Sequence, residues 1–424
     1  MPHEITDRPP QSDPKLQTDL ARNVPHCDGQ RLPIEGVGPW FASKCLIPGL
    51  IIFALALPVC TRLVFVGHGP EGETTDHKLH IGLALDMIRN GIVPPHPLFH
   101  GLLLLLIGGN NEQAAPGITA LILAAALGVR AYLTAGTLAM SRNLSTTTLT
   151  FLCLCLAVAM PLPNWWDWPN VCRGQVAANA WYNPTGIFAM PFALGLFLVG
   201  MRVLDGNGSG PLAAVAGVML LSLLAKPNYV LAFVPCFGVM LAAVLWQAVR
   251  DGRLSAAAAL WKGSLVFAPS AALLAWQYLN LYGGSDPAGG RLLYVPLEVW
   301  KRFTKDHVRA AIGVGIAFPA IVTLLYPGAA NRDRGLVLAW SVTVLGIIHF
   351  ALFAESGDRI IHANLSWGMM LAAHVLFVVS CAFLLRQQGV VRKCLALSVL
   401  ALHVASGSMC LFRSLLEPWN AIRF

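Results

Sequence analysis

Residues 211–248 read PLAAVAGVMLLSLLAKPNYVLAFVPCFGVMLAAVLWQA and are apolar almost throughout. One polar tripeptide, Lys226-Pro227-Asn228, interrupts them. The run has about twice the length of one membrane-spanning helix, which takes roughly 20 apolar residues. Because proline lacks the N–H that a helix interior requires, the interruption predicts two membrane helices that meet at Lys226. A lysine between two apolar helices is a functional hypothesis by default.

The composition of the whole chain also indicates a membrane protein. Hydrophobic residues make up 56% of the 424 and charged residues 12%, whereas soluble domains carry about a quarter charged residues. We therefore expect an all-α integral membrane protein, a polytopic bundle of about 11–12 transmembrane helices. The expected spans are Leu46–Val66, Ile118–Met140, Thr146–Leu162, Ile187–Leu204, Pro211–Ala225, Val230–Ala248, Ser264–Tyr282, Ala310–Tyr326, Leu336–Phe353, Trp367–Leu385 and Leu395–Phe412.

The first residues of the chain differ from the rest. Residues 1–44 are polar and carry charges of both signs, so we expect a flexible cytoplasmic tail before a single integral membrane domain, 45–424. The tail lacks the pattern of a secretory signal peptide, so the first apolar run is expected to be an uncleaved anchor. The apolar segment 98–109 is too short for an ordinary span, and we expect it to dip into the membrane and return. If it crosses instead, the tail or the first loop changes side.

Basic residues are distributed unevenly among the loops. One set marks a side that the positive-inside rule assigns to the cytoplasm: Arg202, Arg250, Arg253, Lys262, Arg332, Arg334, Arg386, Arg392 and Lys393. The break at Lys226 then lies on the external side. The run Lys301–Arg309 is basic and external, against the rule, which suggests an anionic partner. The net charge of +8 does not indicate a nucleic acid, because the basic residues are scattered between spans.

The ten cysteines predict neither a disulfide framework nor a metal centre. Most of them lie in apolar runs, where cysteine behaves as a small hydrophobic residue. Neither a CxxC motif nor a Cys/His zinc spacing is present. No metal-ligating residue is therefore expected.

The segment GETTDHKLHIGLALDMIRNGIVPPHPLFH, 72–100, follows the first span and is rich in titratable groups. Threonines precede Asp76 as helix caps, and a carboxylate is favoured in the first turn. The apolar spacing predicts an amphipathic surface helix over 76–90, with Asp76 and His80 on one face. A carboxylate at this boundary can take a proton from a hydroxyl, although each residue alone is also explained as a cap or an interfacial polar group. The segment adds three candidate binding residues: His77, His96 and His100.

Two later external segments add further candidates. In PNWWDWPNVCRGQVAANAWYNPTG, 163–186, tryptophans flank an aspartate, which suits a sugar ring as well as an interfacial aromatic belt. In ESGDRIIHANLSWG, 355–368, charged residues follow a span directly, and a solvated turn is an equal explanation. With the intramembrane lysine, the candidate substrate-binding residues are Trp166, Asp167, Asn183, Lys226, Glu355, Arg359 and His362.

Four motifs carry a resemblance to a known superfamily: TTDHKLH, PPHPLFH, AKPNY and ESGDRIIHANLSWG. With the spans and the carboxylate-bearing first loop, they resemble bacterial multi-span proteins grouped with the GT-C membrane glycosyltransferases. The resemblance covers 74–367. It implies a polyprenyl-phosphate-linked sugar as donor, a glycan or lipid-linked acceptor, and reaction on the external face of the bacterial inner membrane. The DxD or ExD pattern of several such families is absent around Asp76, so no cofactor is firmly implied and a divalent cation stays open.

The implied chemistry assigns roles to these residues. The acceptor hydroxyl attacks the anomeric carbon while the lipid phosphate leaves, which needs a base and cations. We expect Asp76 to be the base, with His80 or His77 adjusting its charge. Lys226 and Arg359 would hold the phosphate, with Lys301–Arg309 as a further contact. Positive charge on neighbours such as His80 is expected to favour the ionised form of Asp76.

Three other functions would explain part of the same set of charged and polar residues. A lipid-linked sugar flippase or transporter would bind an anionic substrate with the same cations and need no base; internal repeats would favour it. A Wzy-like polysaccharide polymerase relies on arginines and a large late external loop, whereas the longer external loops here come early and carry carboxylates. An assembly subunit without chemistry would leave the titratable cluster unexplained.

Overall fold

The structure is a computed structural model that describes residues 39–66, 76–91, 93–109, 111–163, 174–206, 211–282 and 291–416. All of them belong to one unit, Ile34–Phe424. The expected tail falls almost entirely outside the described residues. The first helix nevertheless begins at Pro39, before the apolar run itself.

Nine helices in these segments are long and apolar enough to cross a membrane. In lipid, a helix satisfies every backbone group within itself, which is why apolar runs take this form. The structure thus agrees with an all-α, multi-span membrane protein. The nine are α2 (Pro39–Val66), α5 (Ala115–Ser141), α7 (Pro184–Asp205), α9 (Asn228–Arg250), α10 (Ala256–Tyr282), α12 (Val308–Leu325), α14 (Arg334–Leu352), α15 (Ser366–Arg386) and α16 (Val390–Leu416).

The remaining elements are short. They are α3 (Asp76–Arg89), α4 (Leu98–Ile107), α6 (Thr146–Val158), α8 (Leu212–Ala225), α11 (Glu298–Thr304), α13 (Pro327–Ala330), the 3₁₀ helix η1 (Gly357–His362) and the antiparallel strands β1 (Leu292–Tyr294) and β2 (Phe353–Glu355). Two of the eleven expected spans, 146–162 and 211–225, form the short helices α6 and α8. With 13 residues, α6 is about 20 Å long, against the roughly 30 Å of a hydrocarbon core.

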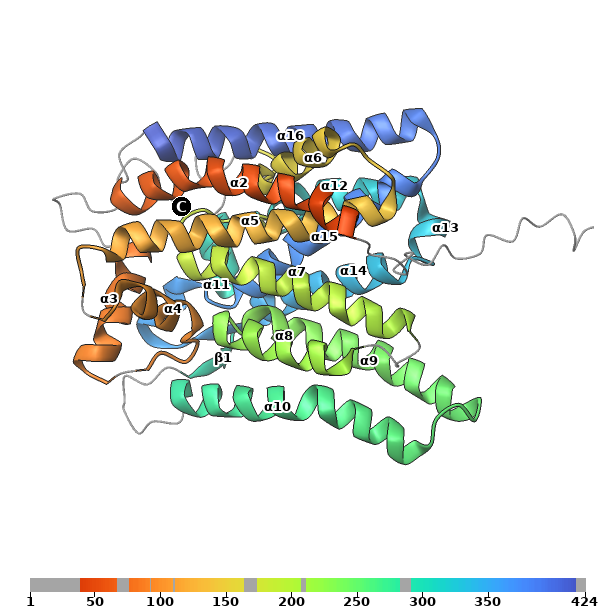
Figure 1. The fold of residues 1–424 in the computed structure, drawn as a ribbon, viewed down its shortest axis with the longest axis horizontal. Coiled ribbons are helices and arrows are strands. Elements are labelled where there is room, and N and C mark those ends of the chain that lie inside the picture. The colour runs from red at the N-terminus through yellow and green to blue at the C-terminus, as the bar shows by residue number, and fades with distance from the viewer. Residues whose placement is uncertain are drawn as a thin grey trace, which may run out of the picture. The chain divides into compact units, whose positions relative to one another are not determined.

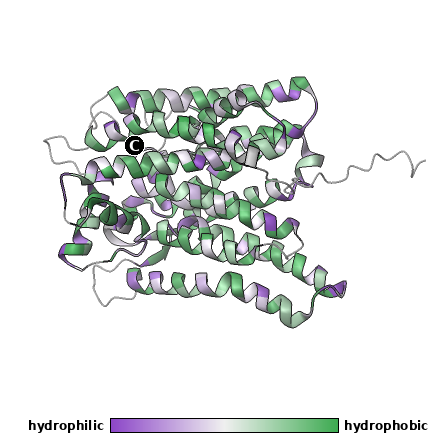
Figure 2. Ribbon diagram, in the orientation of Figure 1, coloured by the Kyte–Doolittle hydropathy of each residue, from purple (hydrophilic) through white to green (hydrophobic). Residues whose placement is uncertain are grey.

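The bundle has two distinct ends. One end carries α3, α4 and β1, and we call it the α3 end; the opposite end carries α13 and the turn between α9 and α10 (Figure 1). Hydrophilic residues gather towards the helix ends, and hydrophobic ribbon fills the length between them (Figure 2). The ten-residue α4 packs beside α3 at this end, and its length of about 15 Å is short of the roughly 30 Å of a hydrocarbon core. Arg250, Arg334 and Arg386 lie at the α13 end, where α9 ends, α14 begins and α15 ends.

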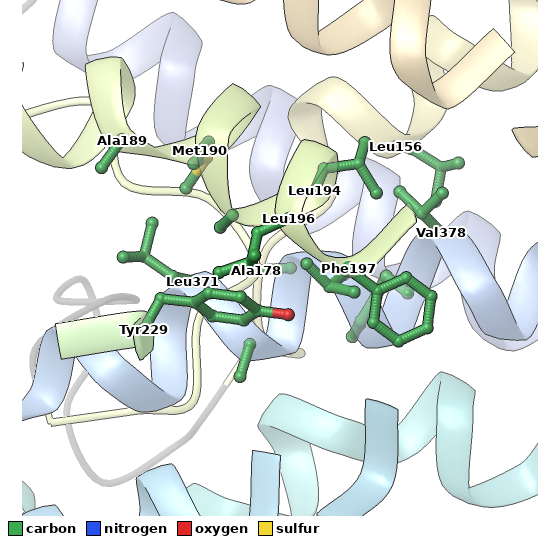
Figure 3. Packing of buried hydrophobic residues seen from close by; sticks show 14 of the residues in the cluster. Leu156, Ala178, Ala189, Met190, Leu194, Leu196, Phe197, Tyr229, Leu371 and Val378 are labelled. Carbon is green, nitrogen blue, oxygen red and sulfur yellow. The ribbon is translucent and has the colours of Figure 1, made fainter. Parts of the chain in front are cut away.

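Helix α15 is the centre of the bundle. Every residue from Ser366 to Leu384 is buried, whereas α10 buries only Val266, Ser270 and Gln277 among its described residues. Met190 and Phe197 of α7 pack with Leu371 of α15 in one large cluster, shown in Figure 3. The same cluster includes Ala178, which belongs to no helix. Non-helical chain therefore runs through the core of the bundle.

This non-helical chain begins where α6 ends. Pro161 and Pro163 lack the N–H groups that would continue the helix, which explains why the expected span 146–162 is cut short. The backbone bonds to neighbouring helices instead: Met160 N donates to His403 O at 3.0 Å, and Leu162 N donates to Val314 O at 3.0 Å. The Ser406 hydroxyl donates to Pro161 O at 2.6 Å.

Glycines on α16 and α12 allow these helices to approach the end of α6 and the non-helical chain that follows it. A Cβ on Gly407 of α16 would overlap the carbonyl oxygen of Val158, and one on Gly315 of α12 would crowd the backbone of Val176. Close approach of backbones at small residues is typical of packed membrane helices. Gly407 therefore lets α16 approach the end of α6, and Gly315 lets α12 approach Val176 of the non-helical chain.

We predict that Gly407→Ala destabilises the folded protein by about 1–3 kcal/mol, because the added methyl forces α16 away from Val158. Thermal unfolding of the detergent-solubilised protein measures the effect. Gly313→Ala on α12 is the control, since a Cβ there has no heavy atom within 4 Å. Equal melting temperatures for the two variants would contradict the tight passage.

We also predict the sidedness of the two ends. Single cysteines at Arg332 and Gln388 at the α13 end should label only from the cytoplasm, and at Tyr294 and Lys305 only from outside, in a background without native cysteines. All four positions are exposed, and the positive-inside rule supplies the direction. Reversed labelling at both ends would overturn the orientation. If the two positions at one end were labelled from opposite sides of the membrane, the assignment of these residues to a common end would be wrong.

Candidate functional site

A hydrogen-bond hub at the α3 end is built around Asn183, the residue that caps α7. Its side-chain oxygen accepts from Gly186 N at 2.7 Å and from the Thr185 hydroxyl at 2.8 Å. Lys226 Nζ donates to the same oxygen at 3.3 Å. Since that oxygen faces donors only, the Asn183 amide nitrogen must point the other way, where it donates to Asp76 Oδ2 at 2.9 Å. One amide thus joins a lysine to a carboxylate.

Asp76 is the first residue of α3 and is half-buried. Within the described residues, its second oxygen, Oδ1, takes part in no hydrogen bond. The N-terminal end of a helix favours a negative charge. Asp76 therefore presents a carboxylate that Asn183 orients through one oxygen.

Lys226 occupies the break between α8 and α9 and is 6% exposed. Its ammonium donates to Thr185 Oγ1 at 2.9 Å and lies 4.1 Å from the centre of the Trp367 ring, a cation–π contact. Burial lowers the pKa of Lys226 to about 7, and the charge of Asp76 partly opposes that shift. Near neutral pH the lysine therefore holds its proton weakly.

Trp367 reaches Lys226 because Gly186, which lies against the tryptophan ring, has no side chain. A Cβ on Gly186, in the first turn of α7, would overlap the Trp367 ring. The tryptophan lies in the first turn of α15, and the next residue, Gly368, lies against the backbone of Asn228. The ends of three helices thus converge on the lysine.

A second carboxylate lies beside this hub. Glu355 on β2 is buried and accepts from the Tyr282 hydroxyl at 3.0 Å and from the Asn364 amide. Arg359 Nη1 lies 3.5 Å from the same carboxylate, and its side chain is 41% exposed. Asn364 O accepts from Asn228 Nδ2 at 2.8 Å. The Glu355 cluster and the Lys226 break are therefore tied together.

Three histidines complete the site: His80 of α3, His100 of α4, and His96, which precedes α4. His80 Nδ1 and His100 Nε2 are 3.0 Å apart, and the His96 ring centre lies 6.3 Å from that of His100. Burial, aided by the nearby charge of Lys226, lowers the pKa of His80 to about 2 and of His96 to about 3. Burial likewise lowers the pKa of His100 to about 4. The three imidazoles are thus neutral, and the expectation that His80 adds positive charge beside Asp76 is wrong.

Most of the residues singled out in the sequence meet at this site. Those brought together are Asp76, His80, His96, His100, Asn183, Lys226, Glu355 and Arg359. His77 is buried in α3 next to Asp76, and His362 is exposed at the end of η1. Trp166 and Asp167 lie outside the described residues.

Sequence reasoning missed several members of the site. Thr185, Tyr282, Asn364 and Trp367 each contact a candidate residue, and Asn228 donates to Asn364. The order Asn-Pro-Thr-Gly at 183–186 carried a usable signal, because an N-cap residue followed by proline marks a helix start. In the described segments, no group of three or more His, Cys, Asp or Glu side chains is placed to hold a metal ion.

We predict that Lys226 titrates near pH 7, whereas a free lysine side chain has a pKa of about 10.4. Pulsed acetylation from pH 5.5 to 9, read by mass spectrometry against a lysine amide in the same tube, measures its midpoint. Asp76→Asn should lower the midpoint, because the charge of Asp76 raises the pKa of Lys226. Asp86→Asn, on the same helix and in contact with Asn90, should leave it unchanged. A Lys226 that titrates with the reference amine would be solvated rather than buried.

No protein-family model, curated protein or solved structure matches this chain.

Proposed function

We propose that the protein is a membrane glycosyltransferase that moves a sugar from a polyprenyl-phosphate-linked donor to an acceptor hydroxyl at the α3 end. The observation that carries the proposal is the link Asp76–Asn183–Lys226, in which one amide holds a carboxylate and a buried ammonium side by side. Such transfer requires a base for the hydroxyl and a cation for the departing phosphate. The resemblance to the GT-C superfamily supports the same assignment.

The reaction balances with groups that the site supplies. The acceptor oxygen forms a bond to the anomeric carbon while the bond from that carbon to the phosphate oxygen breaks. The hydroxyl proton passes to Asp76 Oδ1, and the electron pair of the broken bond leaves with the phosphate. Lys226 and the half-exposed Arg359 neutralise the phosphate. The neutral histidines are suited to sugar hydroxyls, because a neutral imidazole has one donor and one acceptor.

The location of the site agrees with a lipid donor. Lys226 and Asn183 stand where α8 ends and α7 begins, and the surface helix α3 lies at the same end (Figure 1). Lys301 and Lys305 are exposed around α11, and we assign them a contact with lipid phosphate. In this proposal the α3 end faces the outside of a bacterial inner membrane, and the product belongs to a cell-surface glycan.

We predict that Asp76→Asn lowers the rate of sugar transfer by roughly 10²–10⁴-fold, because the amide keeps the hydrogen-bonding shape but removes the base. The assay follows labelled sugar from a panel of synthetic polyprenyl-phosphate hexoses and pentoses in membranes that contain the natural acceptor. Asp86→Asn is the matched control and should transfer normally. Lys226→Met should instead weaken donor binding, because it removes the buried cation.

Two results would contradict the proposal. Equal transfer by wild type and Asp76→Asn would reduce Asp76 to a helix cap. Movement of the lipid-linked sugar across the bilayer without transfer, undiminished in Asp76→Asn but lost in Lys226→Met, would make the protein a flippase.

A further inference from the structure

A second buried cation lies far from the helix ends, within a membrane-spanning helix. Arg130 is near the middle of α5 (Ala115–Ser141) and is 3% exposed. In the described part of the chain it forms no ion pair with a carboxylate. A charge in such a place is costly, and where it occurs it commonly marks a function.

The charge of Arg130 is compensated by hydrogen bonds to an amide side chain and to a backbone carbonyl. Its Nη1 donates to Asn179 Oδ1 at 2.7 Å, and its Nη2 donates to Ala157 O at 3.4 Å. Asn179 Nδ2 in turn donates to Leu156 O at 3.0 Å and to Ala159 O at 2.7 Å. These carbonyls belong to the C-terminal end of the short helix α6, where they lack intrahelical partners and a cation is favoured.

The same guanidinium contacts the chain on both sides of Asn183. Asn179 lies before it in the buried non-helical segment, and Met190 Sδ, 2.8 Å from Arg130 Nη1, lies after it in α7. The intervening Ala180 and Trp181 are buried as well. Arg130 therefore fixes the chain at two points that bracket the hub of the site.

We infer that Arg130 is a positioning residue for this site: it holds Asn183 where the amide can join Lys226 to Asp76. It acts through Asn179 and Met190 and touches neither Lys226 nor Asp76. The inference rests on the proposed function only for the identity of the substrate. The placement of Asn183 depends on contacts within the protein alone.

Loss of Arg130 should therefore change the surroundings of Lys226 at a distance. Without the clamp, Asn183 and the start of α7 shift, and water reaches the lysine. Burial is what holds the Lys226 proton weakly, so hydration shifts its titration towards that of an ordinary lysine. A role confined to stability would leave the titration of the folded fraction unaltered.

The test is the acetylation midpoint of Lys226 in four folded variants, isolated as monodisperse protein. Arg130→Met should raise the midpoint by at least about one pH unit, a tenfold change in proton affinity. Asn179→Ala should also raise the midpoint, because it removes the side chain through which Arg130 holds the chain before Asn183. Arg130→Lys should give a smaller rise, because one ammonium keeps the charge but cannot replace the fork of two N–H groups. Thr134→Ala is the control on α5, since within the described segments its hydroxyl bonds only to the backbone carbonyl of Arg130.

A midpoint that stays at the wild-type value, or falls, in folded Arg130→Lys and Asn179→Ala overturns the inference. If Arg130→Met does not fold, these two variants still test the positioning role of Arg130. The experiment needs no sugar donor. If the wild-type protein transfers no sugar while the midpoints rise as expected, the proposed function fails and the positioning role stands.

Discussion

The whole structure depends on satisfying backbone hydrogen bonds where the chain is not helical in an apolar interior. An unpaired backbone group there costs several kcal/mol. Between Ala159 and Asn183 the described chain relies on side chains from distant helices. His403 shows how strict the matching is: its Nδ1 lies 2.6 Å from Met160 O, and its Nε2 accepts from Phe318 N at 3.3 Å. Only the neutral tautomer with its proton on Nδ1 meets both needs.

The candidate site is a consequence of that passage. The non-helical segment ends at Asn183, whose side chain caps α7 and still has its amide nitrogen for Asp76. In the same way α8 stops at Lys226, and the lysine fills the gap with Thr185 and Trp367. Interrupted helices thus supply polar groups inside the bundle that continuous helices would have satisfied internally. This arrangement is common where membrane proteins bind ions or substrates.

The sequence predicted what depends on local pattern. The break at Lys226 and the start of a helix at Asp76 followed from proline and from helix-capping preferences. The end of α6 at Val158 was missed, because its apolar run continues past the helix and only its prolines mark the change. The role of Asn183 and the neutrality of His80 could not be read from the chain. Both arise from burial and from contacts between residues far apart in sequence.

Burial also sets the charge of the site. With neutral histidines and a Lys226 pKa of about 7, the site carries less positive charge than its composition suggests. An anion beside Lys226 favours the protonated amine, so under the proposed function binding of the donor phosphate would draw a proton from solvent. In the proposed reaction the acceptor proton goes to Asp76 instead. Because Asn183 stands between the two groups, the lysine does not neutralise the carboxylate in a direct ion pair within the described residues. One residue can therefore serve the leaving group while the other serves the nucleophile.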